Sequence, residues 1–180
     1  MSRHVRNSIA TCVDLPGSIV FAMNWVQACE DKNLQDLPYK IELNRRGQII
    51  MSPTRFKHGY YQTQIAFLLQ KLLPHGYVVT ECAVETTEGT KVADAAWSSP
   101  ERFQINKNEF SCSIAPEICV EILSPNNDWE EMMGKRDRYF EKGAQEFWLC
   151  SEAGGLTFFD PTGELPRSKM CPVFPGQITD

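Results

Sequence analysis

The fold is decided by two short apolar runs that each enclose one carboxylate: Val92-Ala93-Asp94-Ala95-Ala96-Trp97 and Ile118-Cys119-Val120-Glu121-Ile122-Leu123. Removing a carboxylate from water is costly unless a positive group meets it. The second run is almost continuously apolar, which is typical of a buried central strand. Two such carboxylates on neighbouring strands would form a cradle for a metal ion. Lys135, on the helix expected after the second run, would complete a hydrolytic site.

The sequence around these runs predicts a mixed α/β domain. Apolar residues at helical spacing predict helices over 21–31, 57–73 and 129–142. A turn at 44–47 lies between two short strand-like segments, so 39–51 predicts a hairpin. Further strands are expected at 77–86, 91–97, 117–123, 146–150 and 156–160, with irregular chain at 98–115 and from Pro161 onward. We therefore expect a mixed α/β domain whose central sheet carries both acids and is preceded by an N-terminal helix and a hairpin.

Length and composition place limits on the class of protein. A chain of 180 residues with 42% apolar and 23% charged residues predicts one globular domain over 1–180, with its core at about 21–160. No apolar segment is long enough to span a membrane, and no secretory signal is evident. Seven cysteines without a Cys-x-x-Cys pair favour a reduced, cytoplasmic protein.

Charge is distributed unevenly along the chain. The net charge is −5, whereas nucleic-acid-binding domains are often strongly basic. Residues 43–80, however, contain no Asp or Glu and several Lys and Arg residues. This segment either faces a phosphate backbone or forms a solvated surface balanced by acidic neighbours in space.

The residue types at the centre suit phosphodiester hydrolysis. A divalent ion polarises the phosphate and activates water, and Mg²⁺ commonly takes one or two carboxylates together with waters. Asp94 and Glu121 would bind Mg²⁺, or Mn²⁺, and Lys135 would position water or stabilise the transition state. The structural alternatives are a strand-edge or turn-capping Asp94, a Glu121 in a structural ion pair, and a solvated Lys135 paired with Glu131.

Three further polar residues are supporting candidates. His58 and Gln62 lie one turn apart at the start of the 57–73 helix, either as phosphate contacts or as polar helix surface. Glu42, in the hairpin, either supplies a further carboxylate or pairs with Lys40 or Arg46. A cysteine nucleophile would need a positioned histidine, for which no local signature exists.

An ordered series of motifs also runs through the chain. It comprises Tyr39-Lys40-Ile41-Glu42-Leu43, Gly47-Gln48-Ile49-Ile50-Met51-Ser52-Pro53, His58, the Asp94 run, Ala115-Pro116-Glu117 followed by the Glu121 run and Ser124-Pro125, Lys135, Tyr139, Gly143 and Glu146-Phe147-Trp148-Leu149. The series resembles the Uma-two family of bacterial restriction-endonuclease-like proteins, in the PD-(D/E)XK nuclease superfamily, over about 21–160. The resemblance implies a restriction-endonuclease-like core, a central mixed β-sheet flanked by helices. It further implies a magnesium-dependent nuclease acting on DNA, with Asp94 and Glu121 as metal ligands. It also implies a homodimer.

Some positions depart from the superfamily's pattern. The superfamily's usual lysine stands two residues after the glutamate, where this chain has Leu123; the Uma-two pattern moves it to the next helix, which matches Lys135. The family's two Pro-Asp dipeptides read Ala93-Asp94 and Pro116-Glu117, and its Gly-Glu reads Gly47-Gln48. We expect a metal-dependent endonuclease that hydrolyses DNA. The alternatives are a catalytically inactive nuclease-like domain that binds nucleic acid or a protein, and a hydrolase of smaller phosphate esters.

Overall fold

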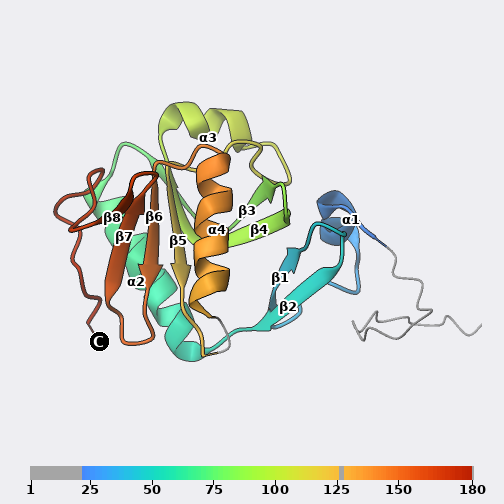
Figure 1. The fold of residues 1–180 in the computed structure, drawn as a ribbon. Coiled ribbons are helices and arrows are strands. Elements are labelled where there is room, and N and C mark those ends of the chain that lie inside the picture. Colours follow the sequence, from blue (N-terminus) through green and yellow to red (C-terminus); the bar gives the residue numbers. More distant parts are fainter. Residues whose placement is uncertain (1–21, 126–127, 180) are drawn as a thin grey trace, which may run out of the picture.

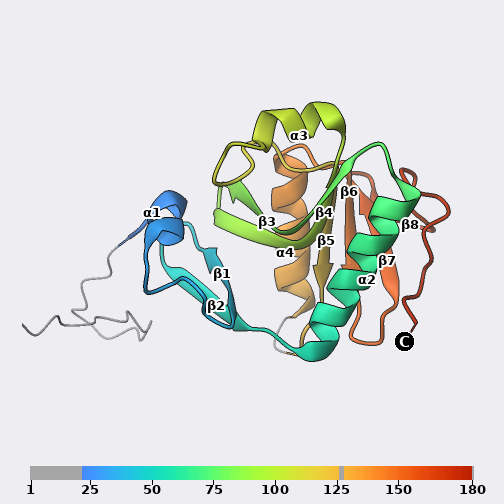
Figure 2. The ribbon, with the colours of Figure 1, turned by 180° about the vertical axis from the view of Figure 1, so that it is seen from behind.

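A six-stranded mixed β-sheet lies between two long helices in the computed structural model, which describes residues 22–125 and 128–179 (Figure 1). The strand order is β3 (Tyr77–Thr86), β4 (Gly89–Ser98), β5 (Ile118–Ile122), β6 (Glu146–Cys150), β7 (Leu156–Asp160) and β8 (Gly163–Leu165). Neighbouring strands are antiparallel except β5 and β6, which are parallel. Helix α2 (Phe56–Leu72) covers one face and α4 (Trp129–Glu141) the other, as the two opposite views show (Figure 2). The expected α/β class is confirmed.

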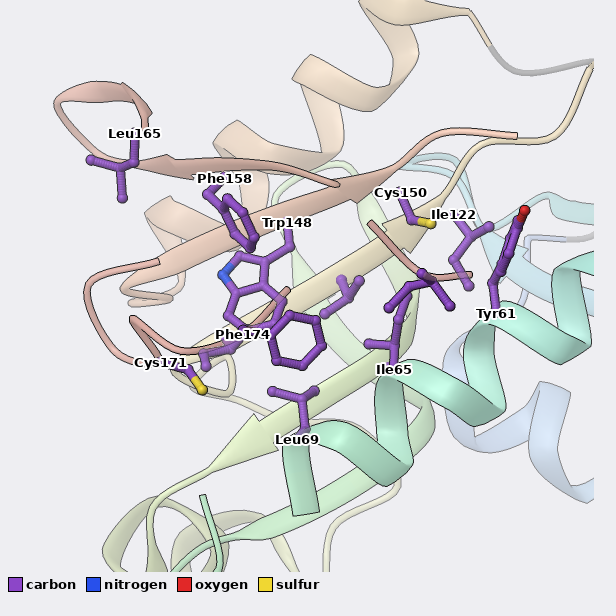
Figure 3. Close-up of a cluster of buried hydrophobic side chains, with 14 residues drawn as sticks. Tyr61, Ile65, Leu69, Ile122, Trp148, Cys150, Phe158, Leu165, Cys171 and Phe174 are labelled. Atoms are coloured by element: carbon purple, nitrogen blue, oxygen red, sulfur yellow. The ribbon is translucent and has the colours of Figure 1, made fainter. Parts of the chain in front are cut away.

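Strand β5 is buried along its whole length, and its two faces have different roles. Ile118, Val120 and Ile122 join the apolar cluster beneath α2, which also contains Trp148 (Figure 3). Cys119 joins the second cluster, beneath α4, with Tyr139 of that helix. Because side chains alternate along a strand, Glu121 lies on the α4 face with Cys119. The alternation of side chains along β5 therefore places Glu121, its one charged residue, on the face covered by α4.

Strands β1 (Tyr39–Leu43) and β2 (Ile49–Pro53) form a separate antiparallel hairpin, which lies with α1 (Trp25–Glu30) beside the sheet (Figures 1 and 2). Glu42 joins the two parts, since its Oε1 accepts a 2.9 Å hydrogen bond from the Val92 amide of β4. The chain also approaches closely at Gly89, where φ is +90° and an added Cβ would lie 2.2 Å from the Leu43 carbonyl oxygen. Glycine is required at that contact.

The structure departs from the sequence expectations in two segments. The stretch 98–115 contains α3 (Pro100–Asn106), whose N-cap Ser99 accepts from the Arg102 amide. Ser-Pro at the start of a helix is a recognised signal, so expecting irregular chain there was wrong for a detectable reason. The tail contains the three-residue strand β8, which pairs with β7 alone at the sheet edge. Helix α1 is shorter than expected, and the expected start at Phe21 lies outside the described residues.

No helix within the described residues has both the length and the apolar character to cross a membrane.

Two glycine substitutions should change stability in opposite directions. Gly89→Ala places a Cβ against the hairpin backbone at a left-handed φ, and should lower the free energy of unfolding by more than about 1 kcal/mol. Gly134→Ala, in α4, meets no heavy atom within 4 Å, and should raise that free energy by roughly 0.5–1 kcal/mol. Urea titrations followed by circular dichroism measure both. Equal effects of the two changes would contradict the close approach at Gly89.

Candidate active site

Asp94 and Glu121 lie on the neighbouring strands β4 and β5, one residue beyond the last pair of the ladder between them. The β4–β5 pairing aligns Ala95 with Val120, and the same register continued by one residue aligns Asp94 with Glu121. Their exposed fractions are 1% and 2%. Because like charges directly opposite each other destabilise a sheet, and buried charges need partners, this pair requires compensating positive groups. The expectation that Asp94 might sit at a strand edge or cap a turn is not met.

Lys40 supplies the first positive charge. Its Nζ lies 2.6 Å from Asp94 Oδ1 and 3.2 Å from Glu121 Oε2, so one ammonium bridges both acids. Burial alone would lower the pKa of Lys40, but Glu121 and Asp94 outweigh burial and raise that pKa well above its ordinary value. From the sequence, Lys40 was expected only as a partner for Glu42, and its bridge between Asp94 and Glu121 was missed. The available signal was the Lys-x-Glu spacing on β1, which puts both side chains on one face of the strand.

Lys135 supplies the second positive charge, from α4. It is buried, and its Nζ lies 2.8 Å from Glu42 Oε1 and 3.4 Å from Glu121 Oε2. The structure thus brings Lys135 into contact with Glu121, while Asp94 lines the same pocket, and the alternative of a solvated Lys135 is wrong. Glu42 lies in the same cluster and pairs with Lys135, whereas the sequence offered Lys40 or Arg46 as its ion-pair partner. Burial favours the neutral form of Glu42, but Lys135 and Lys40 hold its pKa below the usual value.

Further hydrogen bonds fix the two opposed carboxylates. Tyr139 donates its hydroxyl to Glu121 Oε1 at 2.7 Å, and the Ile122 amide donates to Asp94 Oδ2 at 2.7 Å. His58 Nε2 lies 3.2 Å from Asp94 Oδ2. Burial raises the pKa of Glu121 even though two lysines oppose it, whereas Lys40 and His58 overcome the burial of Asp94 and hold its pKa well below the usual range. Asp94 is therefore held firmly as the anion, and Glu121 accepts a proton more readily.

Gln62 and Glu81 shape the sheet at this point. Gln62 Nε2 donates to the Asp94 carbonyl at 2.9 Å and to Glu81 Oε1 at 2.7 Å. Glu81 has φ +51°, and the β3–β4 register would place it opposite Asp94. A non-glycine residue in the left-handed region is uncommon and often marks a functional site. The strand-like sequence around Glu81 gave no signal of this irregularity.

The acids and their lysines line a pocket with a cavity volume of about 40 Å³, which is space on the scale of a few water molecules. Ser52 and Pro53 at the end of β2, and Thr54 and Arg55 before α2, line it as well. From the acid-free segment 43–80, Arg55 and His58 supply the basic side chains of the lining. The segment as a whole does not form one face of the site.

The carboxylate oxygens of Asp94 and Glu121 are ligands of the chemical type that a divalent metal ion such as Mg²⁺ prefers. Residues 22–125 and 128–179 hold no cluster of three or more His, Cys, Asp or Glu side chains arranged for metal binding. Two buried carboxylates nevertheless converge on a single cation, the Lys40 ammonium. Mg²⁺ sites often use only one or two carboxylates and complete the shell with water and substrate phosphate. Asp94 and Glu121 are such a pair.

Comparison with known proteins agrees with this fold. The model of the Uma2 family, described as "Putative restriction endonuclease", matches residues 31–174. Among solved structures, the crystal structure of a putative nuclease belonging to DUF820 from Anabaena variabilis superposes with a TM-score of 0.60 and 20% identity, over 69% of this chain and 73% of that chain. At that identity the likeness shows the fold alone. No curated protein matches the chain.

Loss of the Lys135 charge should destabilise the protein strongly. Lys135→Met leaves Glu42 without its ion pair and Glu121 with one lysine, and should lower the free energy of unfolding by about 3–5 kcal/mol. Arg138→Met is the matched control, because it removes a surface pair with Glu141 from the same helix and should change stability little. Urea unfolding of both variants measures the difference. Equal losses would mean that the Lys135 ammonium is not buried among these acids.

Proposed function

Because the chain belongs to the Uma2 family of "Putative restriction endonuclease" proteins, we propose that it is a metal-dependent endonuclease that hydrolyses phosphodiester bonds in DNA. The observation that supports this most directly is the convergence of Asp94 and Glu121 on one cation, beside the buried Lys135. A structural ion pair needs one partner for each charge. Here two opposed acids are kept on adjacent central strands at the wall of a pocket, although their mutual repulsion makes the arrangement costly.

In this proposal Asp94 and Glu121 hold Mg²⁺ or Mn²⁺. Such an ion, when bound, polarises the phosphate and lowers the pKa of a water. The Ile122 amide and the Tyr139 hydroxyl keep the two carboxylates in place, so little reorganisation is needed when charge develops. Lys135 is fixed by Glu42 and Glu121, and its ammonium stabilises negative charge on the phosphate or orients the attacking water.

Supporting roles follow from the same contacts. Glu42 orients Lys135, Gln62 holds the backbone at Asp94, and His58 contacts the Asp94 carboxylate from the first turn of α2. Arg55 is exposed at the rim of the pocket, where it can meet a backbone phosphate of the substrate. These residues position the substrate and the acids, whereas Asp94, Glu121 and Lys135 act at the reacting phosphate.

Nicking of a supercoiled plasmid tests the proposal. The wild-type protein should nick in Mg²⁺ or Mn²⁺ and not in EDTA, and Asp94→Asn or Glu121→Gln should each reduce the rate by at least about 100-fold, because the ion loses a charged ligand. Asp160→Asn is the control: it removes a carboxylate that pairs with Lys169 outside the pocket, and should cut normally.

Two other outcomes would replace this function with another. DNA retention in a gel-shift assay without any metal-dependent cutting would indicate a nuclease-like binding domain. Turnover of a chromogenic phosphodiester with no cleavage of DNA would indicate a hydrolase of smaller esters. Nicking that survives unchanged in Glu121→Gln would show that cleavage takes place elsewhere or comes from a contaminant.

We propose further that the enzyme works as a homodimer in the reducing cytoplasm. A homodimer would place one active site on each DNA strand, and the cysteines described in the structure are all free thiols. Light scattering after size exclusion should give twice the 20.5 kDa chain mass at micromolar concentration. A mass of one chain, both with and without DNA, would exclude the dimer.

A further inference from the structure

The Lys40 ammonium occupies the point at which Asp94 and Glu121 converge. Its contacts, 2.6 Å to Asp94 Oδ1 and 3.2 Å to Glu121 Oε2, use one oxygen of each carboxylate. The other oxygens are engaged elsewhere, by the Ile122 amide and His58 on Asp94 and by Tyr139 on Glu121. The oxygens that face each other, and that would bind an ion shared by both acids, are the two already taken by Lys40.

We propose that Lys40 is a built-in competitor for the metal ion, and that a divalent cation binds between Asp94 and Glu121 only when the Lys40 ammonium leaves them. This inference rests on the proposed metal site and adds to it the group that limits metal affinity. A lysine ammonium is a point charge on a flexible four-carbon stem, so it can fill and vacate such a position without movement of the sheet.

The charge balance of the pocket favours exchange over joint occupancy. Glu42, Asp94 and Glu121 face two ammonium groups, those of Lys40 and Lys135. Adding a divalent cation while both lysines remain would give this buried set an excess of positive charge, which is costly in a site removed from water. Release of Lys40 as the cation enters restores neutrality.

Lys40, rather than Lys135, is the lysine that is placed to leave. Lys135 lies on α4, is buried, and keeps Glu42 as its shorter contact at 2.8 Å when Glu121 turns to another cation. Lys40 lies on β1, whose backbone pairs with β2 and not with the six-stranded sheet. Its partners are the two carboxylates that the ion would take.

Titration of the protein with Mn²⁺, followed by calorimetry or by the EPR signal of free Mn²⁺, tests the inference without any activity assay. Lys40→Met should bind Mn²⁺ at least about tenfold more tightly than wild type, a difference of about 1.4 kcal/mol. Arg55→Met is the matched control: Arg55 also lines the pocket but makes no ion pair within the described residues. Its removal should change affinity less than threefold, through long-range charge alone.

Lys40→Gln and the double change Lys40→Met with Glu121→Gln complete the experiment. Lys40→Gln gives the same tightening in a variant that keeps polar contacts, in case Lys40→Met folds poorly. The double variant should lose the gain, because Glu121 is one of the two proposed ligands. A crystal soaked in Mn²⁺ should show the ion between Asp94 and Glu121, with the Lys40 amine out of hydrogen-bond distance of both.

The outcomes separate this inference from the proposed function. Binding of Mn²⁺ that needs Glu121 but is unchanged or weaker in Lys40→Met overturns the competitor role and leaves the metal site intact. An ion between the acids with Lys40 still in contact does the same. If no variant binds Mn²⁺ in a manner that depends on Glu121, both the metal site and the role of Lys40 are overturned.

Discussion

The structure depends on positive groups that compensate the charges of two buried carboxylates, Asp94 and Glu121, on the neighbouring strands β4 and β5. Asp94 and Glu121 are almost fully buried and lie one residue beyond the last β4–β5 pair, Ala95 with Val120. Their compensating charges come from distant parts of the chain: Lys40 of the hairpin contacts both acids, and Lys135 of α4 contacts Glu121. One electrostatic requirement therefore ties together the hairpin, two strands and a helix, and it sets the place where a cation can bind.

The sequence predicted most of the fold because its local signals agree with its packing. The Glu121 run reads as a buried strand, and β5 is buried throughout. The bounds of β3, β6 and β7 coincide with those expected from alternation and from turn residues. Helix α3 was missed although Ser99 and Pro100 begin it as the capping rules describe. Strand β8 could not be expected from its own residues, because it is stabilised only by β7 at the sheet edge.

The site was predicted in part. A charged residue within an apolar run gives a local signal, so Asp94 and Glu121 could be identified. Lys135 was proposed from its place on the helix expected after the Glu121 run, and it also matches the family pattern. Lys40 lies on a half-exposed hairpin strand, where a lysine is ordinary, and its role appears only when the hairpin docks beside β4. Glu81 is similar: its left-handed backbone interrupts the β3–β4 pairing, and no residue near it in the sequence predicts that conformation. Local sequence patterns do not predict contacts between segments that are distant along the chain.

The same charges that would serve catalysis also attach the hairpin to the sheet. Leu43 is buried at the base of β1, but the specific contacts from this strand are those of Glu42 with Val92 and Lys135 and those of Lys40 with the two acids. Without metal, the Lys40 ammonium compensates the charges of Asp94 and Glu121, whereas in the role that we propose for it Lys40 releases both acids when a metal ion binds. In that role, the Lys40 ammonium stabilises the pocket without metal and lowers the affinity of the pocket for a metal ion. Stability and ion binding should therefore respond in opposite directions to the charge at position 40, which a purely structural lysine would not produce.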